Sequence, residues 1–144
     1  MKVTEILHRK GADVITIWPG ASLQSAVERM ASRNIGALVV VDDAGKIVGM
    51  VSERDVVLAM AASAEKAPVQ SVTDVMSRRL LTCSPDDSLA ELMAVMTEHR
   101  VRHLPVVDHG QLLGLVSIGD LVKARLGELE FESHVLRDAY LRVR

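Results

Sequence analysis

Two stretches of the chain carry the same pattern: VVVDDAGKIVGMVSERDVV at Val39–Val57 and PVVDHGQLLGLVSIGDLV at Pro105–Val122. In each, an apolar run leads through a short polar turn to a second apolar run that ends in Gly-x-Val-Ser-x-x-Asp. Two β-branched runs joined by a turn containing Asp and Gly predict a β-hairpin. The same hairpin is therefore expected twice, and the fold is built on an internal repeat.

The repeat extends upstream of the hairpins. Val3–Leu7 (VTEIL) resembles Val72–Met76 (VTDVM), and apolar residues at helical spacing follow in both copies. Each copy thus predicts the order strand, helix, strand, strand, helix. In the first copy these elements are expected at Val14–Ile17, Leu23–Met30, Ala37–Val41, Ile47–Val51 and Asp55–Ala62. In the second copy they include a strand at Leu80–Cys83 and helices at Leu89–Met96 and Asp120–Leu126.

One copy of about sixty residues buries too little surface to be stable alone. We therefore expect an α/β (α+β) fold in which two β-α-β-β-α repeats face each other across a pseudo-two-fold axis and share one core. The predicted division is repeat one at residues 1–62, a linker at 63–71, repeat two at 72–127 and a C-terminal amphipathic helix at 128–144. The linker is small and polar, which favours movement of one repeat against the other.

The C-terminal tail has its own pattern. Leu129, Leu136 and Val143 recur every seven positions, with Tyr140 alongside. This spacing predicts an amphipathic helix that extends or follows the last helix of repeat two. Two explanations of its apolar face stay open: packing on its own chain and packing on a second chain.

Composition excludes several classes of protein. The chain has 144 residues, of which 49% are hydrophobic, so it can bury a core. A net charge of −2 and an aromatic content of 2% argue against nucleic acid and anionic membranes as partners. The sequence contains a single cysteine and no apolar run typical of a signal peptide or a membrane span. A cytoplasmic location is the expectation.

Ser-x-x-Asp occurs at both predicted strand-to-helix junctions, as Ser52–Asp55 and Ser117–Asp120. One interpretation is a capping box that satisfies free N–H groups at a helix start. The other is a ligand site, because a carboxylate can accept both hydroxyls of a ribose and free helix N–H groups can meet a phosphate.

The tandem copy, the order of elements and the repeated Gly-x-Val-Ser-x-x-Asp resemble a cystathionine β-synthase (CBS) domain pair, or Bateman module, over residues 1–127. The resemblance implies a stand-alone sensor rather than an enzyme. It implies an adenosine-containing ligand such as AMP, ADP, ATP, NAD(H) or S-adenosylmethionine, and a homodimer that signals to a separate, unidentified protein. The alternative is a ligand-free protein–protein interaction module in which Ser-x-x-Asp only caps helices.

The resemblance also implies two pockets, each built from both repeats. The first candidate set is Ser117, Gly119 and Asp120 with Gly11, Ala12, Ile35, Gly36 and Ala37. The second candidate set is Met50, Ser52, Arg54 and Asp55 with Arg78, Leu80, Val101 and Arg102. Arg102 and His103 are the expected phosphate contacts, since the fork of guanidinium donors suits phosphate. Cations between the pockets favour a phosphorylated ligand over S-adenosylmethionine.

Two other groups of residues are candidates for chemistry. His99 and His103 have the i, i+4 spacing of a zinc pair, but the helix should end near His99, which separates them. Cys83 lies in an apolar stretch and is expected to be a packed side chain rather than a nucleophile. The sequence therefore predicts neither a metal site nor a catalytic residue.

Overall fold

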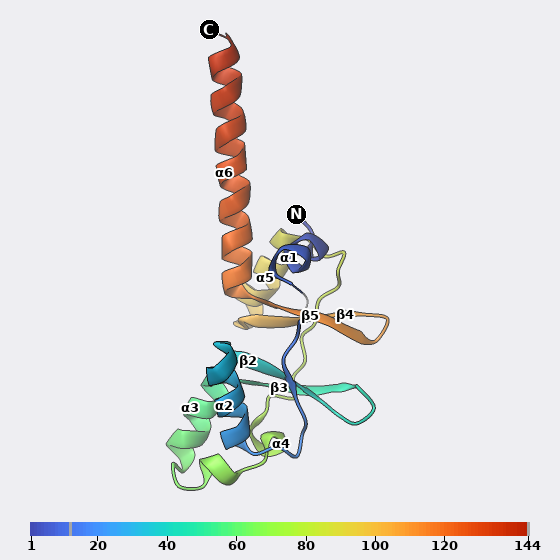
Figure 1. Cartoon of the computed structure of the whole chain (residues 1–144), viewed down its shortest axis with the longest axis vertical. Coiled ribbons are helices and arrows are strands. Elements are labelled where there is room, and N and C mark those ends of the chain that lie inside the picture. The colour runs from blue at the N-terminus through green and yellow to red at the C-terminus, as the bar shows by residue number, and fades with distance from the viewer. Residues whose placement is uncertain (12, 144) are drawn as a thin grey trace.

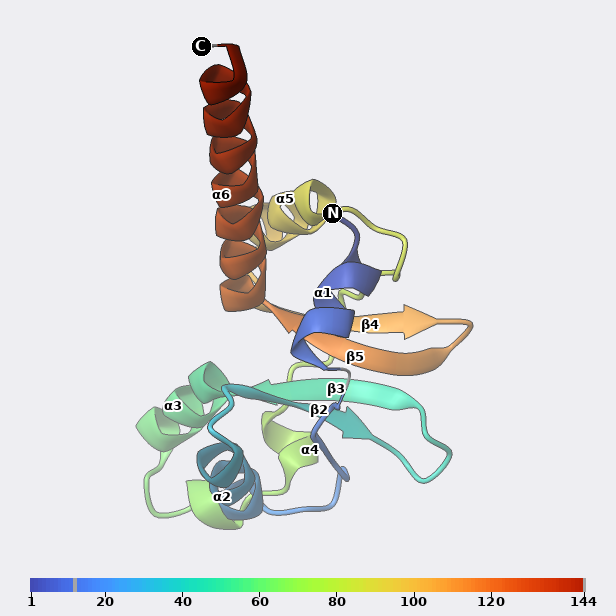
Figure 2. The same cartoon turned by 45° about the horizontal axis from the view of Figure 1, so that its top comes forward.

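A computed structural model describes residues 1–11 and 13–143, apart from the side chain of Val143. The predicted mixed α/β fold is confirmed, as two lobes with a long C-terminal helix projecting from one of them (Figures 1 and 2). The helices are α1 (Val3–Lys10), α2 (Leu23–Arg33), α3 (Glu53–Ala62), the 3₁₀ turn η1 (Ala67–Val69), α4 (Val72–Val75), α5 (Leu89–His99) and α6 (Ile118–Val143). The strands are β1 (Thr16–Ile17), β2 (Ala37–Val41), β3 (Ile47–Ser52), β4 (His103–Asp108) and β5 (Gln111–Ser117).

Each lobe is organised around one of the two hairpins. In the first lobe β2 pairs antiparallel with β3, and β1 adds in parallel on the other side of β2. In the second lobe β4 pairs antiparallel with β5. The registers correspond, because Ala37 faces Ser52 in one hairpin and His103 faces Ser117 in the other. Both serines therefore stand at the last position of a strand, directly before a helix.

The strand predicted at Leu80–Cys83 is wrong, and a proline accounts for the difference. Only Cys83 forms a bridge there, parallel to Val106, with hydrogen bonds from Cys83 N to the Pro105 carbonyl and from Val107 N to the Cys83 carbonyl, both 2.9 Å. The next bond of a parallel ladder needs an N–H at position 105, which proline lacks. In the first lobe Val39 stands at the corresponding position, and β1 forms as a strand.

The core is not shared as one body but consists of two hydrophobic clusters, each of which includes a helix from the other repeat. Val3, Ile6 and Leu7 of α1 pack in the cluster of the second lobe. Val72 and Met76, in and just after α4, pack in the cluster of the first lobe. Each lobe thus contains the first helix of the other repeat. This exchange couples the two repeats through their cores.

Matching hydrogen bonds hold these exchanged helices. The Thr4 hydroxyl donates to the Pro85 carbonyl at 2.8 Å, and the Thr73 hydroxyl donates to the Pro19 carbonyl at 2.7 Å. A short antiparallel bridge joins Lys2 to Ser88 and, in the other lobe, Ser22 to Ser71. The upstream similarity found in the sequence therefore corresponds to a helix docked beside the turn that precedes α5 or α2.

The linker predicted at residues 63–71 is anchored to the first lobe at two points. Ala67 in η1 is fully buried in the first cluster, and its N–H donates to the Ser63 carbonyl at 2.9 Å. The Gln70 carbonyl then accepts from Leu23 N at 2.8 Å, at the start of α2. The small residues of this linker predict movement of one repeat against the other. A small side chain such as that of Ala67 also allows the close approach of backbones that burial requires.

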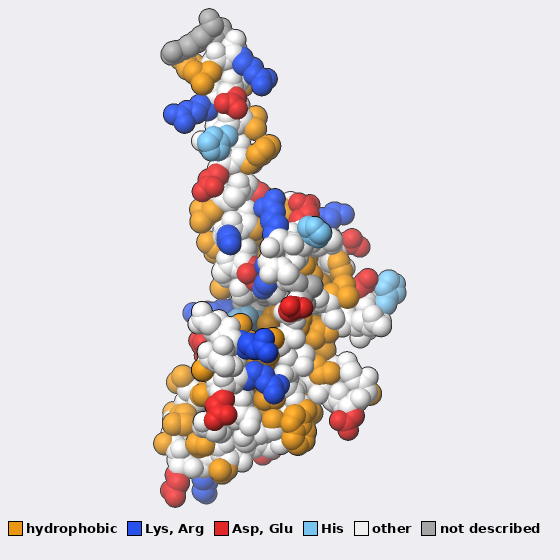
Figure 3. All heavy atoms as spheres, in the orientation of Figure 1, with side chains coloured by type: hydrophobic (Ala, Val, Ile, Leu, Met, Phe, Trp, Pro, Cys, Tyr) orange, Lys and Arg blue, Asp and Glu red, His pale blue; other side chains and the backbone are white. Residues whose placement is uncertain are grey.

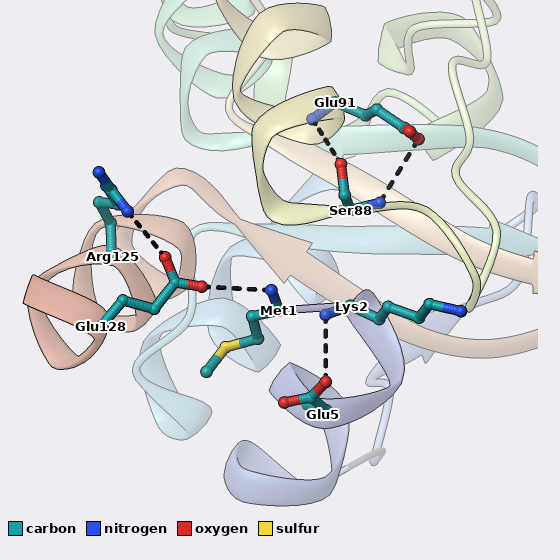
Figure 4. A network of polar contacts seen from close by, with 7 residues as sticks. All are labelled: Met1, Lys2, Glu5, Ser88, Glu91, Arg125 and Glu128. Atoms are coloured by element: carbon teal, nitrogen blue, oxygen red, sulfur yellow. Dashed lines mark hydrogen bonds and ion pairs between the residues drawn. The ribbon is translucent and has the colours of Figure 1, made fainter. Parts of the chain in front are cut away.

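The C-terminal tail extends the last helix rather than following it. Helix α6 continues through Gly127 and spans 26 residues, so its outer part projects beyond the body of the protein (Figure 1). Its base is fastened to the N-terminus, since Glu128 Oε1 lies 3.3 Å from the Met1 amino nitrogen and Glu128 Oε2 accepts from Arg125 at 2.9 Å (Figure 4). The predicted heptad position Val143 lies outside the side chains that the structure describes.

Candidate functional site

The two Ser-x-x-Asp motifs stand at equivalent strand-to-helix junctions. At the first junction, Asp55 Oδ2 accepts a hydrogen bond from Ser52 N at 2.8 Å and from the Ser52 hydroxyl at 3.1 Å. Among the described residues, Oδ1 of Asp55 accepts no hydrogen bond. The cap therefore occupies one oxygen of the carboxylate and leaves the other available to a ligand, so the two interpretations of the motif are compatible.

The second junction has the same cap and one additional partner. Asp120 Oδ2 accepts from Ser117 N at 2.8 Å, and Asp120 N donates to the Ser117 hydroxyl at 3.2 Å. The Lys10 ammonium also donates to Asp120 Oδ2, at 2.6 Å. Burial raises the pKa of Asp120, but the bonds from Lys10 and Ser117 outweigh it and hold that pKa below its usual value.

A cavity of about 630 Å³ opens beside the first junction. That volume is in the usual range for a small-molecule site. Both repeats supply its walls. Its lining residues are Gly36, Met50, Ser52, Glu53, Arg54, Asp55 and Val57 from the first, and Ser77, Arg79, Leu81, Arg100, Val101, Arg102 and His103 from the second.

Positive charge dominates the lining. Four arginines, Arg54, Arg79, Arg100 and Arg102, line it together with two carboxylates, those of Glu53 and Asp55. Arg100 takes a left-handed backbone conformation (φ 55°) at the end of α5, and this turn leads the chain into the wall of the cavity. An excess of arginine in the same cavity as a carboxylate suits a ligand with an anionic part and a hydroxylated part.

His103 stands between the two junctions. It lines the cavity of Asp55, and it pairs in the sheet with Ser117 of the other junction. Burial lowers the pKa of His103 most, and Lys10 and Arg102 lower it further, while Asp120 and Glu53 oppose the shift. The fold therefore favours the neutral imidazole, whereas an anion bound beside it would favour the protonated form.

Most of the second candidate set comes together in this cavity. Seven predicted residues, counting the shared His103, line it: Met50, Ser52, Arg54, Asp55, Val101, Arg102 and His103. Arg78 and Leu80 do not, and their neighbours Arg79 and Leu81 take these places. Successive side chains of extended backbone point to opposite sides, so an error of one position exchanges the residues that face the site.

The first candidate set is more dispersed. Ser117, Gly119 and Asp120 lie together at the junction of β5 and α6. Gly36 lines the cavity of Asp55, not a separate pocket beside Asp120. The remaining predicted members are Ile35, which packs on the first cluster, the buried Ala37, and Gly11, which follows α1 with a φ of 91°. Ala12 lies outside the described residues.

Sequence reasoning missed three charged residues of the cavity: Glu53, Arg79 and Arg100. Arg79 has a signal in the repeat. The offset that aligns Val3 with Val72 aligns Lys10 with Arg79, so both repeats carry a basic residue at this position. The Arg79 guanidinium Nη2 lies 3.4 Å from Nδ1 of His99, the last residue of α5. Arg100 carried no such signal, because its position depends on a left-handed turn that favours Asn or Gly.

Cys83 is a buried side chain, and His99 and His103 lie in different elements. Burial, assisted by Asp87, raises the pKa of the Cys83 thiol to about 12. His99 ends α5 and His103 begins β4, and no group of three metal-ligating side chains occurs in the part of the chain that the structure describes. Within that part, none of the helices is long and apolar enough to cross a membrane.

The sequence model of the CBS domain matches the chain twice, at residues 3–62 and 72–127. This chain belongs to the CBS domain family. The two matches coincide with the two repeats, so the protein contains a tandem CBS pair, as the resemblance in the sequence had indicated.

Relatives of this CBS pair occur in bacteria and plants. The CBS domain-containing protein YhcV of Bacillus subtilis is 36% identical over 108 residues, which cover 75% of this chain and 76% of that protein. The mitochondrial protein CBSX3 of Arabidopsis thaliana is 31% identical over 134 residues, covering 88% of this chain and 65% of that protein. Both are described as CBS-domain proteins.

Solved structures agree with the fold of this CBS pair. The crystal structure of the CBS-domain containing protein ATU1752 from Agrobacterium tumefaciens superposes with a TM-score of 0.84 at 40% identity, covering 86% of this chain and 92% of that one. The CBS domain pair of protein MJ0100 superposes with a TM-score of 0.77 at 25% identity, covering 86% and 98%. That pair was crystallised with 5′-methylthioadenosine and S-adenosyl-L-methionine. Some structural neighbours of this protein thus bind adenosine-containing ligands.

Proposed function

We propose that this CBS pair is a regulatory module, not an enzyme, and that it binds an adenine nucleotide in the cavity between its repeats. One observation carries the proposal: the cavity places the half-free carboxylate of Asp55 in the same enclosure as four arginines. A ribose diol would bond to Asp55, and the phosphate would lie among the arginines. The ligands of the MJ0100 pair carry no phosphate, so they support only the adenosine part of this proposal.

The charge of the lining favours AMP, ADP, ATP or NAD over S-adenosylmethionine. S-Adenosylmethionine carries a sulfonium cation and no phosphate, whereas the cavity holds Arg54, Arg79, Arg100 and Arg102. Like charges in a confined site oppose binding, and guanidinium groups bond phosphate through paired donors. Gly36 adds a stretch of wall without a side chain, and the Glu53 carboxylate lies against it.

The experiment is a thermal-shift panel on the full chain with AMP, ADP, ATP, NAD, adenosine and S-adenosylmethionine. A ligand at one hundred times its dissociation constant stabilises the fold by about 2.7 kcal/mol. We expect the phosphorylated compounds to raise the melting temperature and S-adenosylmethionine to leave it unchanged. No shift with any compound would instead favour the ligand-free interaction module, in which Ser-x-x-Asp only caps helices.

A route for the signal to a separate protein follows from the backbone beside the cavity. Ile118 N, at the start of α6, donates to the Arg102 carbonyl at 2.8 Å. A ligand held by the Arg102 side chain is therefore one hydrogen bond from the helix that projects from the protein. We expect AMP to slow hydrogen exchange at the start of α6 as well as at the cavity, and protection confined to the cavity would contradict this route.

We further propose that the protein is a cytoplasmic homodimer in which α6 pairs with α6 of a second copy. Five exposed apolar residues at three-, four- and seven-residue spacings form one stripe along the helix: Val122, Leu126, Leu129, Leu136 and Tyr140. Figure 3 shows hydrophobic side chains among charged ones on this projecting helix. An antiparallel pair centred near Ser133 would place Glu130 of one copy beside Arg137 of the other, so the charges are complementary.

A further inference from the structure

The cavity of this CBS pair contains a second carboxylate, whose counterpart in the other repeat is apolar. Glu53 begins α3 and Ile118 begins α6, at equivalent positions of the two repeats. The main chain of Glu53 donates a hydrogen bond from its N–H to the Gly36 carbonyl at 3.0 Å. Ile118 N donates in the same way to the Arg102 carbonyl at 2.8 Å. The duplicated backbone thus places a carboxylate at one junction and a hydrocarbon side chain at the other.

A glycine leaves room for the Glu53 side chain. Gly36 of the first repeat corresponds to Arg102 of the second, so the wall beside Glu53 carries no side chain. A Cβ atom at Gly36 would lie 3.4 Å from Oε1 of Glu53 and 3.4 Å from its carboxyl carbon. The carboxylate therefore lies against bare backbone, in the cavity that both residues line.

The charge of Glu53 is not paired, but it acts on the residues around it. Among the described residues, its side chain forms neither a hydrogen bond nor an ion pair, although four arginines line the same cavity. Burial lowers the pKa of His103 most, whereas the charges of Asp120 and Glu53 raise it. Glu53 therefore acts electrostatically on His103, which is one of the two expected phosphate contacts.

Glu53 limits the positive charge that the cavity offers to a ligand. The described residues of the lining include four arginines and two carboxylates, those of Asp55 and Glu53, and the fold favours the neutral form of His103. The guanidinium groups therefore exceed the carboxylates by two. A phosphate monoester such as AMP carries about two negative charges at pH 7, and each further phosphate adds roughly one more. AMP would balance the excess of the lining, whereas ATP would surpass it.

We propose that Glu53 discriminates against nucleotides with additional phosphates, so that this site binds AMP more tightly than ATP. The inference rests on the proposed function and adds to it the class of nucleotide and the residue that selects it. The further phosphates of ATP bring negative charge into an enclosure that already holds the unpaired carboxylate of Glu53. Like charges repel, and repulsion of the wrong ligand is a source of specificity.

Titration calorimetry with AMP and with ATP tests the proposal on the full chain, at low ionic strength and without divalent cations, which would mask the charge of ATP. We expect wild type to bind AMP more tightly than ATP. Glu53→Gln keeps the size of this exposed side chain and removes its charge, and it should strengthen ATP binding about threefold or more relative to AMP binding. Glu65→Gln removes a carboxylate outside the cavity lining, so this matched control should leave the ratio of the two affinities unchanged.

The outcomes separate the role of Glu53 from the nucleotide site itself. If wild type binds both nucleotides but ATP more tightly, or if Glu53→Gln keeps the wild-type ratio of affinities, the role of Glu53 is overturned and the nucleotide site stands. Equal gains or equal losses for AMP and ATP in Glu53→Gln would assign Glu53 to the adenosine part that both share, which also overturns discrimination by charge. Binding of neither AMP nor ATP to wild type would overturn both proposals.

Discussion

The two Ser-x-x-Asp junctions of this CBS pair have the same backbone geometry and different neighbouring side chains. Both carry a serine at the end of a strand and an aspartate three residues later, and in both the aspartate Oδ2 accepts from the serine N–H at 2.8 Å. At Asp55 a cavity with four arginines opens, while at Asp120 the ammonium of Lys10 completes an ion pair. A duplicated motif therefore fixes the local geometry, and residues from outside the motif give its two copies different neighbours.

The largest expected effect concerns how far the two lobes are independent. Leu38 and Leu104 are equivalent core residues, and both are fully buried. We expect Leu38→Ala and Leu104→Ala each to lower the free energy of unfolding by about 2–5 kcal/mol. Because each cluster contains a helix from the other repeat, urea unfolding followed by circular dichroism should remain a single transition in both variants. Two separate transitions would show that the lobes unfold independently.

The next effect concerns phosphate. Arg102→Ala should weaken AMP binding about tenfold or more, since a hydrogen bond to a charged group contributes about 1.5–3 kcal/mol. Adenosine has no phosphate, so its affinity should change little. The measurement is titration calorimetry with both compounds, and Arg9→Ala on the exposed surface of α1 serves as the control. Equal losses for AMP and adenosine would remove Arg102 from the phosphate site.

The projecting part of α6 provides a comparison with the packed base of the same helix. Leu121 and Ala124 at the base are buried, while Leu129 and Leu136 further out are exposed. Removing residues 128–144 should convert a dimer to a monomer in light scattering at tens of micromolar, because the apolar stripe would lose its partner. Leu136→Glu should act in the same direction with the chain intact. A wild-type monomer at that concentration would contradict the dimer.

The smallest effect is the pH dependence that His103 introduces. Its pKa is lowered in the fold, chiefly by burial, so below its usual value of about 6.5 the unfolded chain binds a proton that the folded chain does not. Stability from this source is complete above that pH and falls as the pH drops from 6.5 toward the folded pKa. Urea unfolding between pH 7.5 and 5.5 should show a weaker dependence in His103→Gln than in wild type. An identical dependence would mean that His103 does not titrate in this way.

The sequence predicts the features that depend on neighbouring residues and misses those that depend on residues far away in the chain. The hairpins, the caps and the helices α2 and α5 follow from residue type and spacing, and Ala37–Val41 was predicted to the residue. The exchange of α1 and α4 could not be predicted, since the similarity of Val3–Leu7 to Val72–Met76 shows a repeat but not which lobe it packs on. The lost strand at Cys83 depends on Pro105, a residue of a different segment.

The site shows the same limit. The pattern identified Ser52, Asp55 and Arg102 because they belong to a repeated motif or break its symmetry, and the cavity includes all three. The prediction named Arg78, whereas Arg79 lines the cavity. The side chains that an extended segment presents to a site depend on its register, which the sequence does not show. The contact of Lys10 with Asp120 joins residues 110 positions apart, and nothing in either local sequence indicates it.

The most direct test of nucleotide binding at the Ser52–Asp55 junction is titration calorimetry with AMP on Asp55→Ala and Asp120→Ala. Both substitutions remove the same helix cap, at a cost of about 0.5–2 kcal/mol in stability, so each controls for the other. We predict that Asp55→Ala weakens AMP binding about tenfold or more, and that Asp120→Ala leaves the affinity for the first AMP within about twofold of wild type. Equal affinities in the two variants, or a loss confined to Asp120→Ala, would contradict the assignment of the nucleotide to Asp55.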